Sequence, residues 1–423
     1  MFGQESVIVS GFDAVREMLS SAACDGSPEM FRLQHYSQKC GYGFEQPNEE
    51  WKICRKATFR GIRAYGSGLS RMDKVLSDIA QVTMSQFGEK EGEFLNPWEE
   101  LYTYMLRSTS AFIFGENIDV TDDVYKQVKE LDELANQVLS PTGNGAELDI
   151  FPWLRFLNHP VWKKCKKLDE VRDSLWSKVK QYTIDHLERN EPSAIGDFLM
   201  QALNNNEISE RRMKNSVGDL LVAGTISTTA STYALLNILA HHKGVQEKVQ
   251  EEVDRVVGRS DLPCLSDEEM MPYTAALLLE LQRYLSVTPL GLPHCATADT
   301  QMAGYTIKKD TPVLYNSWAL HNDENIWGDP SAFRPERFLD EHGALLPSTH
   351  VYCRSMVAFG LGRRTCPGRK FAMSRVFFML TLLMQKYTIE ADPENPVTHD
   401  PSTFSVDLAI NPTPYTVKLC PRA

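Results

Sequence analysis

One cysteine of the chain, Cys366, lies in a segment rich in glycine and arginine that runs from Phe359 to Gly368 with the sequence FGLGRRTCPG. Gly362 and Gly368 allow the backbone to turn tightly and to approach a flat partner closely. Loop N–H groups, and the positive end of a helix expected to begin near Gly368, would hold the sulfur as a thiolate. A thiolate held in this way is a strong single ligand for a haem iron and favours O–O cleavage. The segment therefore predicts a haem-iron axial ligand at Cys366.

Three other interpretations of this segment are weaker. A buried structural cysteine would not need glycine and arginine at fixed offsets. A zinc site would need more ligands, but the chain has no C-x-x-C pair and no H-E-x-x-H motif. A dinucleotide-binding loop would favour a third glycine at Thr365 and a preceding strand, and it would disfavour the bulky pair Arg363 and Arg364.

The pattern F-x-x-G-x-R-x-C-x-G resembles the haem-binding signature of the cytochrome P-450 monooxygenases. Its fixed positions are matched by Phe359, Gly362, Arg364, Cys366 and Gly368. One departure is Ala358, where the family usually has proline; this affects loop stiffness and not ligation. The resemblance covers nearly all of the chain from residue 5 and is nearest to the animal microsomal enzymes that oxidise steroids and foreign compounds.

The resemblance implies a mainly α fold with small β-sheets, as one domain over residues 1–423, with a long central helix crossing over haem b (iron protoporphyrin IX). It also implies partners for the two haem propionates. Trp51 and Arg55 match the family's W-x-x-x-R, His294 follows Leu292-Pro293 where related animal enzymes place a histidine, and Arg364 adds a third cationic position. Packing alone is the commoner role of a tryptophan, and a lone histidine is more often only hydrogen-bonded locally.

The oxygen-activating region is expected halfway along the long helix, where Ala223-Gly224 matches the family pattern. A glycine inside a helix costs about 1 kcal/mol relative to alanine, which favours a functional reason for Gly224. The family continues with an acid and a threonine, but this chain has Ile226 and Ser227. Ile226 cannot relay protons, whereas Ser227 can donate and accept a hydrogen bond, and Thr228 is the adjacent hydroxyl. Back-bonding to helix carbonyls is the alternative role of these hydroxyls.

Glu280 and Arg283 form an E-x-x-R pair one helical turn apart within an apolar segment, which favours burial. As a bare motif, such a pair is usually a solvated surface contact of little value. The family joins the two residues to an arginine in a Pro-Glu-Arg-Phe segment, which here supplies Arg337. By resemblance, this network has a structural role: it holds the cysteine loop in place.

Composition bounds the class of protein. The chain has 423 residues, 42% hydrophobic residues and a net charge of −12, which argues against nucleic-acid binding. Its nine cysteines show no framework spacing and are expected to be reduced. No apolar run reaches the roughly 18 residues that a membrane span needs, so the chain by itself reads as soluble and cytoplasmic. By resemblance, the expected location is the cytosolic face of the endoplasmic reticulum membrane, and an anchor, a first helix and a first strand are expected to be missing.

Apolar spacing predicts a mostly helical chain. The expected helices cover residues 12–19, 50–65, 72–86, 99–114, 122–139, 161–189, 193–204, 211–242, 244–258, 267–285 and 371–385. The region 211–242 is the longest and would span about 48 Å at 1.5 Å per residue. The expected strands cover 7–10, 304–307 and 311–315, and 404–419 is expected to form a hairpin with Pro412 and Pro414 near its turn.

The resemblance also implies an NADPH-dependent flavoprotein reductase as the electron source and a lipophilic small molecule as the substrate. The basic helix 50–65 lacks acids between Trp51 and Tyr65, so the expected docking residues are Lys52, Lys56, Arg60 and Lys370. A solvated basic face is an equally good explanation of any one lysine. Two alternatives to oxygen insertion stay open: a haem-thiolate isomerase or dehydratase, suggested by Ile226, and a non-catalytic haem-binding fragment.

Overall fold

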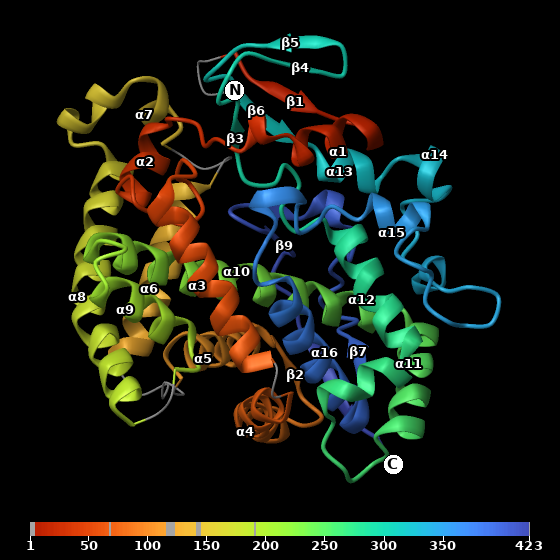
Figure 1. Cartoon of the computed structure of the whole chain (residues 1–423). Helices are drawn as coiled ribbons and strands as arrows, with labels where there is room; N and C mark the ends of the chain where they lie inside the picture. The colour runs from red at the N-terminus through yellow and green to blue at the C-terminus, as the bar shows by residue number, and fades with distance from the viewer. Residues whose placement is uncertain (1–4, 67–68, 116–122, 141–144, 190–191, 423) are drawn as a thin grey trace.

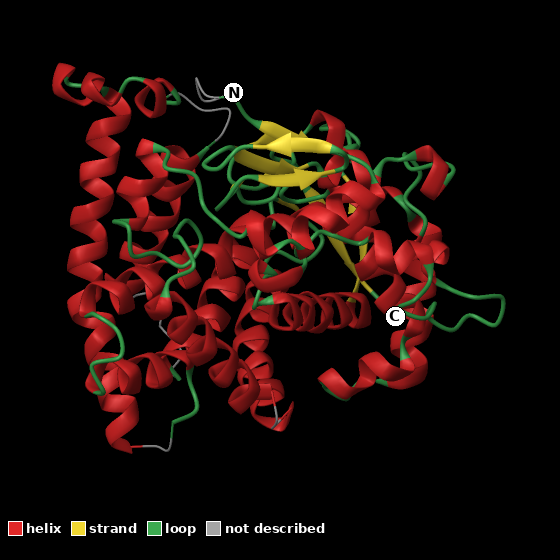
Figure 2. Cartoon of the chain, turned by 45° about the horizontal axis from the view of Figure 1, so that its top comes forward, coloured by secondary structure: helices red, strands yellow, loops and turns green. Residues whose placement is uncertain are grey.

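The computed structural model describes residues 5–66, 69–115, 123–140, 145–189 and 192–422. The described chain is mostly helical, and its strands form small sheets, several of which gather at the end of the molecule that holds the N-terminus (Figures 1 and 2). This confirms the predicted fold class. Position 122 and the two ends of the predicted single domain, 1–4 and 423, lie outside the described residues.

The helices follow the predicted ranges closely. They are α1 Phe12–Ser20, α2 Phe31–Ser37, α3 Glu49–Gly66, α4 Leu69–Gly88, α5 Trp98–Phe114, α6 Asp123–Leu139, α7 Glu147–Ile150, α8 Pro160–Arg189, α9 Ile195–Asn204, α10 Glu210–His241, α11 Lys243–Val256, α12 Pro272–Leu285, α13 Ser317–His321, α14 Glu324–Trp327, α15 Val351–Ser355 and α16 Arg369–Lys386.

The strands are short. They are β1 Val7–Val9, β2 Phe94–Leu95, β3 His294–Cys295, β4 Thr300–Met302, β5 Tyr305–Ile307, β6 Pro312–Tyr315, β7 Tyr387–Ala391, β8 Ser405–Val406, β9 Ile410–Asn411 and β10 Val417–Pro421. One sheet has the order β1-β6-β3, with β1 parallel and β3 antiparallel to β6, and another has the order β2-β10-β7. The first sheet places His294 opposite Val313.

Helix α10 forms the centre of the molecule (Figure 1). It has 32 residues, and most of its side chains from Thr228 to Ala240 are buried. Ser209 caps its first turn, because the Ser209 hydroxyl accepts a hydrogen bond from the Arg212 N–H. Helices α5, α9, α11, α12 and α16 all contact α10. Helix α10, which carries the predicted oxygen-site residues Gly224, Ser227 and Thr228, is therefore packed against other helices on several sides.

Two sequence predictions were wrong in detail. The helix expected over 267–285 is a 3-10 turn, Leu265–Met270, followed by α12 from Pro272, because proline has no N–H with which to continue the preceding helix. The hairpin expected over 404–419 turns at residues 407–409, between β8 and β9. Pro412 and Pro414 instead link β9 to β10, which pairs with β7 and β2.

Apolar side chains are exposed together on α7 and the following 3-10 turn, Pro152–Leu157. Trp153 is 55% exposed, Phe156 is 74% exposed and Leu157 is 66% exposed, with Ile150 and Phe151 nearby in the chain. Within the described ranges, no helix is both long and apolar enough to cross a membrane.

Candidate functional site

The cysteine loop forms one wall of an internal cavity. A 3-10 turn at Gly362–Arg364 leads into Cys366, whose N–H donates to the Phe359 carbonyl at 2.8 Å. Helix α16 begins directly after Gly368. Across the cavity from the loop lies α10, and the lining from the two elements consists of Asp219, Leu220, Val222, Ala223, Gly224, Ile226, Ser227 and Thr228 on α10 and Phe359, Gly360, Leu361, Arg364, Cys366, Pro367 and Gly368 on the loop.

The Cys366 thiol faces this cavity and is enclosed by protein beyond it. Enclosure raises the pKa of the thiol, while the N–H groups of Gly368 and Arg369 and the charge of Arg55 lower it. The expected polar groups at the helix start are thus present, but they do not outweigh desolvation. That these groups hold the sulfur as a thiolate stays a prediction, and a bound metal ion would add a further positive charge beside the sulfur.

The two glycines of the signature have different surroundings. Gly362 has a φ of +67°, and a Cβ there would lie 2.2 Å from the Leu19 carbonyl oxygen at the end of α1. Gly368 has a φ of −83°, and a Cβ there would lie 3.8 Å from the Cys366 sulfur, which is an ordinary contact. Gly362 therefore allows the loop to pack against α1. The sequence analysis gave another reason for this glycine, the close approach of the backbone to a flat partner.

Cationic side chains line one edge of the cavity. Arg55 lies on α3, with its guanidinium carbon 5.4 Å from the centre of the Trp51 ring, and it donates to the Thr365 carbonyl at 2.5 Å. Arg364 donates to the carbonyls of Gly26 and Gly43, which ties the cysteine loop to the segment before α3. The structure thus brings both predicted arginines to one edge of the cavity.

The other two predicted propionate partners are also at the cavity. The indole N–H of Trp51 donates to the Tyr42 carbonyl at 3.0 Å. His294 is buried, and its Nδ1 donates to the Cys24 carbonyl at 2.7 Å, so Nε2 carries the lone pair in the neutral ring. Burial and the Arg364 charge lower the pKa of His294 to about 4. His294 could donate to a carboxylate only after taking up a proton at Nε2.

The hydroxyls of α10 make local contacts. Ser227 donates to the Ala223 carbonyl at 2.9 Å, which is the back-bonding alternative. Thr228 is buried and accepts from Arg375 at 3.1 Å. At Gly224, a Cβ would lie 2.9 Å from Cγ2 of Thr109, so this glycine allows α5 and α10 to approach closely. Close helix packing is thus a structural reason for Gly224, in addition to the space for dioxygen that we predicted.

Sequence reasoning missed two charged residues that line the same cavity. Asp219 on α10 accepts hydrogen bonds from the N–H groups of Tyr42 and Gly43, and burial raises its pKa. Arg375 on α16 is fully buried. The available signal for Arg375 was a cation inside the otherwise apolar stretch that follows Cys366. Neither the positive charge of Arg375 nor its distance from Cys366 in the sequence could show that its side chain reaches α10.

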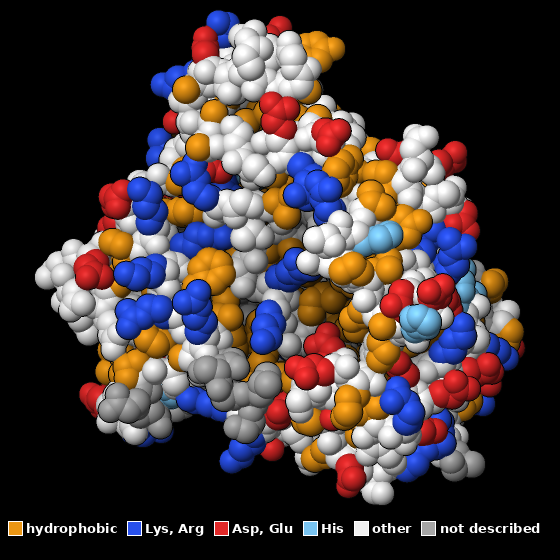
Figure 3. Space-filling model, turned by 45° about the vertical axis from the view of Figure 1, so that its right-hand side comes forward, with side chains coloured by type: hydrophobic (Ala, Val, Ile, Leu, Met, Phe, Trp, Pro, Cys, Tyr) orange, Lys and Arg blue, Asp and Glu red, His pale blue; other side chains and the backbone are white. Residues whose placement is uncertain are grey.

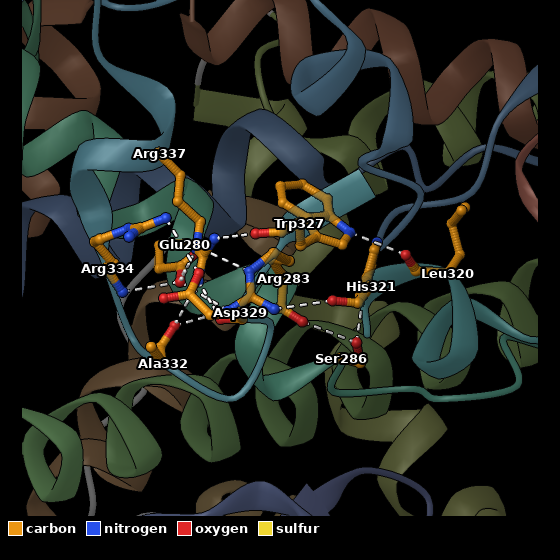
Figure 4. A network of polar contacts seen from close by, with 10 residues as sticks. All are labelled: Glu280, Arg283, Ser286, Leu320, His321, Trp327, Asp329, Ala332, Arg334 and Arg337. Atoms are coloured by element: carbon orange, nitrogen blue, oxygen red, sulfur yellow. Dashed lines mark hydrogen bonds and ion pairs between the residues drawn. The ribbon is translucent and has the colours of Figure 1, made fainter. Parts of the chain in front are cut away.

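Figure 4 shows a network of buried charged side chains that joins α12 to the segment around Arg337. Glu280 accepts from the Nε and one Nη of Arg283, both at 2.7 Å, and from Arg337 Nε at 3.3 Å. All three side chains are fully buried. Arg283 also donates to the His321 carbonyl, and the His321 ring accepts from the Val357 N–H, two residues before Phe359. The network therefore connects α12 to the start of the cysteine loop.

The chemistry of the cavity fits a haem. One sulfur faces it from the loop, apolar side chains of α10 lie opposite, and Arg55 and Arg364 line an edge suited to carboxylates. At the same edge, the Tyr42 hydroxyl is buried and makes no hydrogen bond with the described residues. A buried hydroxyl without a partner is costly, so a polar ligand group there would be favourable. No other cluster in the described ranges has the ligands for a metal ion.

Comparisons with known proteins agree with this arrangement. The family model described as "Cytochrome P450" matches residues 1–419. Cytochrome P450 2U1 of Rattus norvegicus is 29% identical over 98% of this chain and 79% of its own length. Cytochrome P450 1A1 of Felis catus is 29% identical over 90% and 76%. Steroid 17-alpha-hydroxylase/17,20 lyase of Mesocricetus auratus is 28% identical over 92% and 78%.

The cavity thus has the residues expected of a haem site, with Cys366 on the loop before α16 and the long helix α10 in its wall. The chain belongs to the cytochrome P450 family and is a monooxygenase of that family. The predicted family resemblance is therefore confirmed.

Proposed function

We propose that this monooxygenase inserts one oxygen atom of dioxygen into a lipophilic small molecule of steroid-like or xenobiotic type. The observation that carries the proposal is the placement of Cys366 opposite the apolar Leu220, Ala223 and Ile226 in one cavity. Bound haem, held through the Cys366 sulfur, would supply dioxygen activation. A relative at 28% identity is named a steroid 17-alpha-hydroxylase/17,20 lyase, which supports substrates of this size and polarity.

In this proposal, the residues of the chain bind the haem and hold the cysteine loop and the opposite cavity wall in position. Trp51, Arg55 and Arg364 would lie beside the haem propionates, and His294 would donate to them once protonated. The buried network of Glu280, Arg283 and Arg337 would hold the cysteine loop in position. Gly224 shapes the wall opposite the sulfur together with Ser227, whose hydroxyl can exchange its bond to Ala223 for one to a ligand. Ile226 contributes only apolar surface and cannot relay a proton, so a proton would have to arrive through neighbouring hydroxyls or ordered water.

Electrons are proposed to come from an NADPH-dependent flavoprotein reductase that docks on the basic side of α3. Lys52, Lys56 and Arg60 are exposed there, although Lys52 pairs with Glu49. Lys370 is exposed at the start of α16, but its charge also acts on Glu268. On the face drawn in Figure 3, Lys and Arg side chains gather beside a hollow. We therefore rank Lys56 and Arg60 above Lys370 as docking residues.

Reductase docking is tested by charge reversal. Lys56→Glu should slow reduction and reduce its salt dependence, because complementary surface charges act mainly on the association rate. Lys178→Glu on α8 is the matched control, since it changes the net charge equally. Equal effects of the two variants would disprove docking at α3.

We further propose that the exposed apolar side chains of α7 and Pro152–Leu157 rest on the endoplasmic reticulum membrane at its cytosolic face. Trp153, Phe156 and Leu157 form the most exposed part. Binding to phospholipid vesicles should fall when Trp153 and Phe156 are both changed to Ser. Vesicle binding that is unchanged in this variant would contradict the proposal.

The proposed reaction is tested with purified protein loaded with haem. A panel of lipophilic compounds should produce substrate-dependent spectral shifts, and reductase, NADPH and dioxygen should then give products that have gained one oxygen atom. Cys366→Ser should abolish the thiolate spectrum of the carbon monoxide complex. Cys353→Ser, a part-buried thiol outside the cavity, is the control and should retain it. A parental spectrum in Cys366→Ser would overturn the whole assignment, and turnover without reductase or dioxygen would favour an isomerase.

A further inference from the structure

Arg375 is a fully buried cation that has no carboxylate partner among the residues that the structure describes. Its side chain lines the cavity that contains Cys366, and it stacks on Phe371, with its guanidinium carbon 4.0 Å from the ring centre. The other buried arginines of the core, such as Arg32 and Arg283, are each paired with an acid. Among the described residues, the one titratable group whose charge acts on Arg375 is the Tyr104 hydroxyl.

The guanidinium donates only to neutral oxygens. One Nη donates to Gly224 O at 2.7 Å and to the Thr228 hydroxyl, and the other donates to Thr109 Oγ1 at 2.6 Å, to Met105 O and to the Ser108 hydroxyl. Nε makes no hydrogen bond with the described residues. Since both Nη groups are occupied, Arg375 is unsuited to clamp a ligand carboxylate with its fork. What it offers to the cavity is its charge.

A buried charge without a counter-ion is strongly unfavourable, so a compensating negative charge is expected nearby. No described side chain supplies this charge. The arginines at the cavity edge differ, because Arg55 is part-exposed and Arg364 has Asp25 beside it. Arg375 is thus the cavity cation whose charge is least neutralised by protein or solvent.

We infer that Arg375 is a positioning charge whose counter-ion is the anionic haem-thiolate group, and that it raises the reduction potential of that haem. The inference rests on the proposed haem-thiolate site. The electron that the reductase delivers adds negative charge to the haem, and a fixed cation in a low-dielectric wall stabilises the reduced form. The same charge favours binding of the anionic group over the empty cavity. In this way α16 would carry both the sulfur at its start and a counter-charge further along.

The inference is tested with three variants measured as haem-free and haem-loaded protein. Arg375→Met removes the charge and keeps the approximate volume. Arg375→Lys keeps the charge and loses the fork. Arg32→Met is the control, a buried arginine paired with Asp149 and absent from the cavity lining. The readouts are the potential of the substrate-free haem protein, by spectroelectrochemical titration, and urea unfolding of the haem-free protein.

For Arg375→Met, the equilibrium constant for one-electron reduction should fall about tenfold, a fall of about 60 mV. Its haem-free form should be no less stable than the parent. Arg375→Lys should keep the parental potential, and Arg32→Met should lose haem-free stability with the potential unchanged. A haem-free Arg375→Met that is less stable, with a parental potential when loaded, would make Arg375 a structural link only and overturn the inference. Failure of the parent to bind haem would instead refute the proposed function.

Discussion

Two glycines of the cysteine loop offer a controlled test of why the signature needs glycine. Gly360 and Gly362 have nearly equal φ angles, +66° and +67°, so alanine at either position pays the same left-handed backbone cost of about 1–2 kcal/mol. Their surroundings differ. A Cβ at Gly360 would be 3.7 Å from the Tyr315 hydroxyl oxygen, whereas at Gly362 it would lie 2.2 Å from the Leu19 carbonyl oxygen. The Leu19 carbonyl belongs to the backbone of α1, so it cannot rotate away from a new Cβ as a flexible side chain could.

Gly360→Ala should therefore lower the free energy of unfolding by about 1–2 kcal/mol, which is the backbone cost alone. Gly362→Ala should cost a further 1–3 kcal/mol, because the loop or α1 must shift to remove the overlap. The shift would also displace Cys366, so the haem-loaded variant should show a smaller fraction of the thiolate carbon monoxide spectrum. Urea unfolding of both variants, followed by circular dichroism, measures the difference. Equal losses in the two variants would refute the packing argument.

Three further predictions follow from the core and the long helix. Glu280→Gln leaves the buried Arg283 with only a neutral partner, while Arg337 keeps its ion pair with Asp329, and should lower the free energy of unfolding by about 3–5 kcal/mol in urea titrations; a loss under 1 kcal/mol would contradict the network's role. Burial and the Arg283 charge lower the pKa of His321 to about 3. The contribution of the neutral His321 ring to the free energy of unfolding is therefore fully present above pH 6.5, and the free energy of unfolding should fall by about 1.4 kcal/mol for each pH unit between 6.5 and about 3. His321→Gln should flatten that slope, and an unchanged slope would exclude His321 as its source. A Cβ at position 224 would lie 2.9 Å from the methyl group of Thr109. Gly224→Ala should therefore raise the free energy of unfolding, by up to about 1 kcal/mol, only in a protein where Thr109→Ser has removed that methyl group. Additive effects of the two substitutions in a double-mutant cycle would disprove the contact.

The helices were largely predictable because each buries one apolar face, and burial leaves a regular spacing in the sequence. The long helix was predicted as 211–242 and is observed as Glu210–His241. The errors came where spacing carries less information. Pro272 divides a helix that has continuous apolar character, and the strand pairing of β10 with β7 and β2 depends on segments distant in the sequence.

The site was predictable only in part. The signature located Cys366, and the motifs placed Arg55, His294 and Arg364 at what proved to be the cavity edge. The sequence could not show that desolvation outweighs the N–H groups around the sulfur, since burial is a property of the packed molecule. It also could not show that Nδ1 of His294 is already committed to the Cys24 carbonyl.

By itself, the sequence determined the residue types and their spacing: one cysteine, with its arginines and glycines, matches the haem-binding signature of the family to which the chain belongs. Only the tertiary structure decided which charges share that cavity. Arg375 reaches Gly224 and Thr109 because α16, α10 and α5 cross at one point. The physical reason is that ligation depends on local atoms, whereas electrostatic energy depends on distance and burial, which arise when remote segments pack together.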